Sequence, residues 1–206
     1  MKITDIKPQK RKKNRFNLYL DDNFFCSLSE DIIIGSKIEI GQQITKKELE
    51  KLIQKDQLDK ALNKAIRLLS YRSRTENEIR KKLLEKKFDN KIIAKVIKKL
   101  QKMGYLSDQF FIESWIRDRI NIKPSGKKLL KIELIKKGIP ETKAQKFLEK
   151  LVNPKIELQM AEKAFRKAQK NYRHLTGYEK KQKITAYLAR RGFEWTLIEQ
   201  LLNKNK

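Results

Sequence analysis

The sequence is poor in cysteine and histidine, with one of each, Cys26 and His174, among 206 residues. A single cysteine permits no internal disulfide, and the two residues together supply no metal-ligand cluster. Long apolar runs are also missing, because the longest, from Ala186 to Ala189, falls far short of the roughly 20 residues that cross a bilayer. Residues 1–13 are charged and contain no apolar signal-peptide core. We therefore expect a soluble, unexported, cytoplasmic protein without a metal, a cofactor or a membrane partner.

Acidic residues are scarce beside basic ones. The chain has 51 Lys and Arg against 25 Asp and Glu, a formal net charge of +26. A compositional drift toward Lys, Ile and Asn explains part of this excess, but the same drift also favours Glu. The imbalance produces self-repulsion that a polyanionic partner relieves, and nucleic acid is the leading candidate. At 39% hydrophobic residues the chain can still form packed domains.

The first 44 residues favour β structure. Apolar residues alternate with polar ones on both sides of residues 21–23, which is typical of two short strands around a tight turn: Phe16, Leu18, Leu20 before it, and Phe24, Cys26, Leu28 after it. Ile38 and Ile40 suggest one more short strand. The basic run from Lys10 to Lys13 is expected in a loop that either stays in water or contacts phosphate.

Glycine and proline are absent from Gln42 to Met103, which favours helices there. Thr45 with Glu48, and Thr75 with Glu78, have the spacing of a capping box. Two helix starts are thereby predicted.

The strongest signal is a repeat with origins at Ile79, Leu130 and Ile184. Apolar residues recur at equivalent offsets from each origin, although Lys143 and Asn205 break the pattern: Leu83, Leu84, Phe88, Ile92, Ile93, Val96, Ile97 and Leu100; Leu134, Ile135, Ile139, Ala144, Phe147, Leu148 and Leu151; Leu188, Ala189, Phe193, Leu197, Ile198, Leu201 and Leu202. The spacing predicts a helix, a turn and a second helix in each repeat. The predicted turns contain Gly138 and Gly192, whereas the first repeat has Lys87 there.

A further amphipathic segment precedes each helix pair, so each unit is expected to have three helices. The predicted fold is mainly α, with three tandem helix-turn-helix-like repeats in an elongated curved array after a small β-hairpin extension. The predicted domains are the β extension at 1–44, the first repeat with its lead-in helix at 45–106, the second repeat at 107–152 and the third at 153–206.

Short motifs in a fixed order give the chain a family resemblance. They are Ala65 to Arg72, Thr75 to Phe88, Gly104 to Asp108 leading into Phe110 and Phe111, Lys136 to Ile139, and Ala189 to Phe193. Together they resemble the RecX regulatory proteins from about Asp59 to Asn203. Ser107 stands where the family commonly has an acid, and Lys87 where it commonly has glycine.

The resemblance implies a regulator that binds the RecA recombinase filament on single-stranded DNA and inhibits its recombinase, ATPase and coprotease activities. It also implies the SOS response and homologous recombination as the setting. We expect a monomer that acts on this filament and on the single strand within it, and free DNA is a further possible ligand.

Catalytic motifs are lacking. Ser125 to Lys128 has the ending of a phosphate-binding loop, but Asn121 replaces its first glycine and Lys128 replaces the Ser or Thr that would hold Mg²⁺. His174 lies in a basic stretch without a recognisable nucleophile. We therefore expect a protein that is not an enzyme, and assign no catalytic residues.

Basic residues at the ends of the middle helices are candidate partner or nucleic-acid contacts. Lys86, Lys137 and Arg191 share one repeat position, with Lys136 and Arg190 beside two of them. A cation in a last helical turn also suits the helix dipole, by about 0.3 to 1 kcal/mol, so both explanations stay open for each residue.

Three further lysines, Lys127, Lys128 and Lys131, begin the middle helix of the second repeat, where the dipole disfavours cations. They are therefore stronger candidates for binding than the basic residues at the ends of the middle helices.

Three aromatic residues could stack on bases. Core packing is the stronger expectation for Trp115 and Tyr105, and Trp195 is balanced between the two roles. A stand-alone helix-turn-helix DNA-binding protein is the alternative function, and a plain scaffold is a third.

Overall fold

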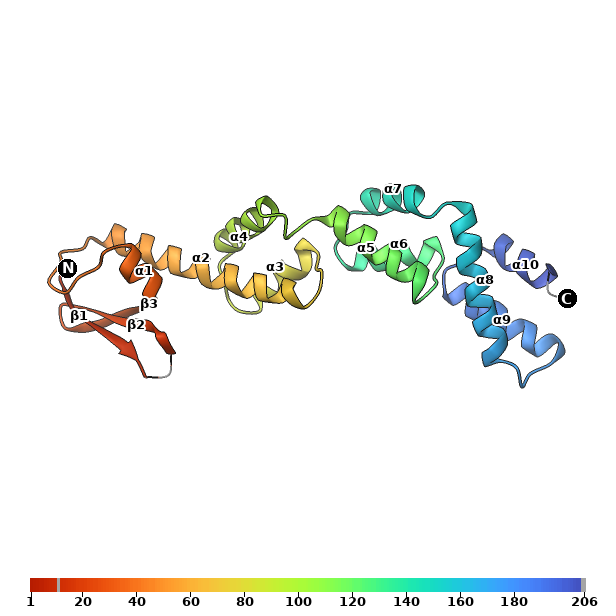
Figure 1. The fold of residues 1–206 in the computed structure, drawn as a ribbon, viewed down its shortest axis with the longest axis horizontal. Coiled ribbons are helices and arrows are strands. Elements are labelled where there is room, and N and C mark those ends of the chain that lie inside the picture. Colours follow the sequence, from red (N-terminus) through yellow and green to blue (C-terminus); the bar gives the residue numbers. More distant parts are fainter. Residues whose placement is uncertain (11, 205–206) are drawn as a thin grey trace. The chain divides into compact units, whose positions relative to one another are not determined.

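A computed structural model describes residues 1–10 and 12–204 of the chain. They form two compact units: unit 1 comprises Met1–Arg72 and Arg80–Tyr105, and unit 2 comprises Ser73–Ile79 and Leu106–Lys206. The described residues form a small three-stranded sheet and ten helices, and Figure 1 shows their arrangement within each unit.

Unit 1 begins with a three-stranded antiparallel sheet in the order β1-β2-β3, followed by a short helix (Figure 1). Phe16 pairs with Leu28 and Leu18 with Cys26, so the predicted hairpin is confirmed. Its turn is formed by Asp21 and Asp22, both with positive φ, as in the two-residue turns that match strand twist. The elements are β1 (Ile3–Gln9), β2 (Lys12–Leu20), β3 (Asn23–Ser29) and α1 (Glu30–Gly35).

The strand predicted at Ile38 and Ile40 is wrong. Lys37 takes a left-handed φ of 49°, and the Ile38 N–H donates to the Ile33 carbonyl, which closes the end of α1. The third strand is β1 instead. The basic loop predicted from Lys10 to Lys13 is shorter than expected, because β2 already begins at Lys12. Arg11, in this predicted loop, lies outside the described residues.

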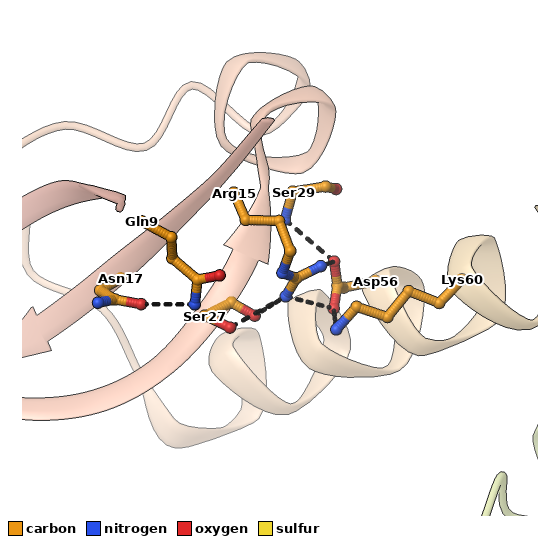
Figure 2. A network of polar contacts seen from close by, with 7 residues as sticks. All are labelled: Gln9, Arg15, Asn17, Ser27, Ser29, Asp56 and Lys60. Atoms are coloured by element: carbon orange, nitrogen blue, oxygen red, sulfur yellow. Dashed lines mark hydrogen bonds and ion pairs between the residues drawn. The ribbon is translucent and has the colours of Figure 1, made fainter. Parts of the chain in front are cut away.

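An ion-pair network fixes the sheet to the long helix α2 (Lys46–Tyr71), as Figure 2 shows. The Arg15 guanidinium donates to both carboxylate oxygens of Asp56, at 3.1 and 3.3 Å, and also to the Ser27 carbonyl and hydroxyl. The Ser29 N–H donates to the same carboxylate at 3.0 Å, and the Lys60 ammonium lies 2.5 Å from it. Burial alone would raise the pKa of Asp56, but the hydrogen bonds from Lys60 and Arg15 outweigh it and lower that pKa.

The rest of unit 1 places α4 against α2. The capping box at Thr45 is present, as is the one at Thr75, so both predicted helix starts are confirmed. Asp89 caps α4 through the Lys91 N–H. The bounds are α3 (Glu76–Leu84) and α4 (Asn90–Lys102).

Unit 2 holds two three-helix repeats around one apolar core. The second repeat is α5 (Asp108–Asn121), α6 (Lys127–Lys136) and α7 (Glu141–Leu151). The third is α8 (Pro154–Asn171), α9 (Gly177–Arg190) and α10 (Trp195–Lys204). With α2, α3 and α4 as the first repeat, the mainly helical fold of three three-helix domains after a small sheet is confirmed, whereas the curved array and the four domain boundaries stay predictions.

The repeat pattern is right at most positions and fails at one. The origins and the positions four and nine residues later are buried or half-buried in all three repeats. The fifth residue after each origin is exposed instead: Leu84 (47%), Ile135 (40%) and Ala189. The buried face of the middle helix is therefore narrower than its apolar stripe.

The predicted turns end their helices in the left-handed conformation. φ is 61° at Lys87, 87° at Gly138 and 79° at Gly192. In each case the next residue donates its N–H to the carbonyl five residues back, which is the Schellman arrangement. Lys87 takes this geometry against the preference of a residue with a Cβ.

Candidate nucleic-acid and partner interface

Within unit 2, the same contact occurs twice between successive repeats. The Thr75 hydroxyl donates to the Lys137 carbonyl at 2.6 Å, and the Gly126 N–H donates to the Arg191 carbonyl at 2.8 Å. Both donors stand four residues before a repeat origin, and both acceptors stand seven after the next origin. We call this contact the repeat seam.

Glycine makes the seam possible because the backbones approach closely. A Cβ on Gly126 would lie 2.1 Å from the Gly192 carbonyl oxygen, and one on Gly192 would lie 2.4 Å from the Leu129 backbone nitrogen. At the equivalent contact, a Cβ on Gly138 would lie 2.3 Å from the Asn77 side chain. The seam also engages the Gly126 N–H, so the phosphate-loop-like motif cannot offer that N–H to a phosphate.

Lys137, a predicted site residue, is half-buried and its ammonium is engaged by other groups of the chain. Its ammonium lies 2.8 Å from a Glu78 carboxylate oxygen and 4.9 Å from the Trp115 ring centroid. The Arg119 guanidinium lies 4.2 Å from the same ring, and the indole N–H donates to Glu133. Trp115 is partly buried against the core, as predicted, and its π system is engaged by the chain's own cations.

Arg191 has a similar position in the third repeat. Its guanidinium lies 5.3 Å from the Tyr187 ring centroid and donates to the Tyr187 hydroxyl at 3.1 Å. The other terminal nitrogen, Nη1, is buried without a hydrogen-bond partner in the described part of the chain. Lys137 and Arg191 therefore belong to the seam region, and their side chains are less available to an external ligand than exposed cations are.

The three lysines at the start of α6 each have an acidic partner. The pairs are Lys127 with Glu157 at 3.4 Å, Lys128 with Glu194 at 3.2 Å and Lys131 with Glu141 at 2.8 Å. The hydrogen bond from Lys131 lowers the pKa of Glu141. These acids offset the dipole penalty that made the lysines stand out in the sequence. Glu194 and Glu141 are exposed, and exposed pairs contribute about 0 to 1 kcal/mol, whereas Glu157 is buried.

The remaining three candidates are exposed: Lys86, Lys136 and Arg190. Over residues 1–10 and 12–204, their side chains form no ion pair or hydrogen bond. They are the predicted cations most available to a polyanion.

A groove of about 420 Å³ lies among α6, α9 and α10. Lys128 and Arg190 line it with Trp195, whose residue surface is 58% exposed. Its apolar lining includes Ile132 and Phe193. The sequence singled out both cations and the tryptophan but contained no signal that places them together.

The burial expected for Tyr105 is wrong, since this residue is 54% exposed. It follows Gly104, whose left-handed φ of 74° ends α4, and only its backbone N–H is needed to close that helix end.

Four domain models of one protein family match the chain. They are the regulatory protein RecX N-terminal domain at residues 1–45 and the first, second and third three-helix domains of RecX at 61–100, 107–148 and 155–202.

The chain is also similar to whole curated proteins. It is 34% identical to the regulatory protein RecX of Clostridium acetobutylicum over 98% of this chain and 95% of that one. With the RecX of Clostridioides difficile the identity is 30% over 98% and 94%.

Solved structures agree with these matches. A crystal structure of regulatory protein RecX superposes with a TM-score of 0.72 at 28% identity, covering 98% of both chains. RecX from Lactobacillus salivarius gives 0.63 at 29% identity over 72% of this chain and 96% of that one. In the part of the chain that the structure describes, no helix is both long and apolar enough to span a membrane.

Proposed function

Because the chain belongs to the RecX family of regulatory proteins, we propose that it binds the RecA filament on single-stranded DNA and inhibits its recombinase, ATPase and coprotease activities. It acts by binding, without catalysis of its own, as a cytoplasmic monomer.

The recurrence of exposed cations at matching repeat positions supports this proposal most. Lys136 and Arg190 both stand six residues after a repeat origin, next to the two seam residues Lys137 and Arg191. A filament also presents the same surface repeatedly, and it carries a polyanion. A binding protein with repeated contacts gains effective concentration at each further contact once the first is made.

The predicted site residues then divide by role. Lys86, Lys136 and Arg190 contact the filament or its strand directly. Lys128 and Lys131 contribute after giving up their exposed acid partners, which costs little because exposed pairs are weak. Lys127 contributes at a larger cost, because its partner Glu157 is buried. Lys137 and Arg191 act indirectly, by holding successive repeats together.

ATP turnover by RecA on single-stranded DNA tests the proposal. We expect substoichiometric amounts of the protein to lower it, and unchanged turnover at saturating protein would refute the proposal. The triple variant Lys86→Gln, Lys136→Gln, Arg190→Gln should inhibit less and should reduce the salt slope of binding by roughly 2, because three fewer counterions are displaced from a single strand.

A control of equal charge separates a specific surface from bulk charge. Lys163, Lys167 and Lys170 are exposed on α8, and replacing all three with Gln removes the same charge. This control should inhibit nearly as well as the natural protein. Equal loss in both triple variants would mean that net charge alone drives binding.

Titration against naked DNA and assembled filaments at one salt concentration tests the alternative. We expect the filament to bind more tightly. Equal or tighter binding to naked duplex DNA would favour a stand-alone helix-turn-helix protein.

A further inference from the structure

We infer that the groove among α6, α9 and α10 holds a base of single-stranded DNA against the Trp195 indole, with the adjoining phosphates at Lys128 and Arg190. The inference rests on the proposed function in one respect, since the strand concerned is the one that the filament carries. It adds a direct nucleotide contact that belongs to the third repeat and to the start of α6.

The first support is an aromatic face without an internal partner. Trp195 opens α10 directly after the turn at Gly192, and more than half of its surface is exposed. Across the described residues, its indole N–H donates to no protein group. Trp115 is the opposite case, with its ring between two cations and its N–H bonded to Glu133.

The second support is the shape and lining of the groove. Its volume of about 420 Å³ lies in the range of pockets that hold small ligands. Ile132 and Phe193 give it an apolar lining, which suits the face of a base. A base inside a duplex has both faces covered by its neighbours, so only an unpaired strand can offer one for stacking.

The third support is charge. Arg190 is exposed, and Lys128 is paired with the exposed Glu194 at 3.2 Å, with 66% of the Lys128 side chain exposed. A groove for an apolar peptide side chain would need no cations at its edge. Two cations beside an aromatic face match a nucleotide, which is a π surface joined to an anion.

Among the described residues, Glu194 is the one acid paired with a cation of this groove, and its charge would repel a phosphate bound there. Its ion pair with Lys128 must open when the strand binds. Glu194→Gln removes the competing charge and releases Lys128, so it should tighten binding about two- to fivefold, as expected from the low energy of exposed pairs.

The experiment titrates the full chain with oligo(dT) and follows tryptophan emission. Stacking should quench Trp195, so emission should fall in the natural protein and stay nearly constant in Trp195→Ala, which keeps only Trp115. Binding of Trp195→Ala, measured by anisotropy of a labelled oligo(dT), should be roughly tenfold weaker. A duplex of equal length should not quench.

Tyr178→Ala is the matched control. Tyr178 is an exposed aromatic of α9 in the same unit and does not line the groove. It should bind oligo(dT) as the natural protein does. Circular dichroism and the unfolding temperature verify that each variant is folded.

The outcomes separate the two proposals. If the protein inhibits RecA but oligo(dT) neither quenches Trp195 nor binds more weakly to Trp195→Ala, the inference fails and the proposed function stands. If Trp195 responds to oligo(dT) but RecA turnover is unchanged, the proposed function fails and the inference stands. If Trp195→Ala loses only filament binding, with oligo(dT) binding intact, the groove binds protein and the inference is overturned.

Discussion

Replacing Asp56 with Asn should destabilise unit 1 more than any single surface substitution. Asp56 is 3% exposed and Arg15 13% at the side chain, so the substitution leaves a nearly buried guanidinium without its counter-charge. Removing one partner of such a pair typically costs 3–5 kcal/mol. Asn can still accept the Ser29 N–H, and the pair with the more exposed Lys60 adds little. We therefore expect a loss of about 3 kcal/mol.

The loss can be measured by thermal and urea unfolding followed by circular dichroism at pH 7. In a unit of about 100 residues, 3 kcal/mol corresponds to a fall in the unfolding temperature of at least about 10 °C. Asp59→Asn is the control, because Asp59 lies on the same helix and beside the same network but outside its ion pairs. It should change stability by less than about 0.5 kcal/mol.

The pH dependence gives an independent check on the same variant. The folded-state pKa of Asp56 is lowered from 3.8, so the folded state prefers the charged form. Its contribution is therefore fully present above about pH 4 and is lost as the pH falls toward the lowered pKa. The stability gap between the natural protein and Asp56→Asn should shrink from pH 5 to pH 3. A gap below about 1 kcal/mol at pH 7, or one that widens in acid, would refute this reasoning.

Three further substitutions test the turns and the seam. Lys87→Gly should stabilise the first repeat by about 0.5 to 1 kcal/mol in urea unfolding, because relief of the left-handed strain exceeds the added chain entropy; a loss of stability would contradict that explanation. Gly126→Ala should lower the unfolding temperature of unit 2 markedly, since its Cβ would meet the Gly192 carbonyl, whereas Gly35→Ala, with open space around it, should change little. Thr75→Val should cost about 2 kcal/mol by removing the hydrogen bonds of the Thr75 hydroxyl with the Lys137 carbonyl and the Glu78 N–H, and a neutral result would show that water replaces the hydroxyl.

Much of the fold could be predicted from the sequence because its signals are local and repeated. Capping boxes, helical periodicity and turn glycines depend on residues a few positions apart, and the helical periodicity recurs in all three repeats. The strand at Ile3–Gln9 was missed because its apolar residues do not alternate and Pro8 interrupts it. It pairs with β2, which follows it directly in the chain, but the alternation that marks a strand is present only on the β2 side of this hairpin.

The candidate site was less predictable because its groups meet across repeats. Nothing near Lys128 in the sequence indicates Glu194, and nothing near Lys137 indicates Trp115 or Glu78. The sequence places Lys137 and Arg191 at one repeat position, and their backbone carbonyls do form equivalent contacts, each accepting a hydrogen bond from the preceding repeat. A pattern of side chains gives no indication of contacts made by backbone carbonyls.

The repeat seam restricts how such a protein can diversify. Gly126 and Gly192 belong to different repeats, yet a side chain on Gly126 would meet the Gly192 backbone, and one on Gly192 would meet the backbone of Leu129. A duplicated or exchanged repeat can therefore join its neighbour only if it brings a small residue or a hydroxyl at one end and a left-handed turn at the other. Lengthening of the chain by whole repeats therefore requires this match at every new junction between repeats.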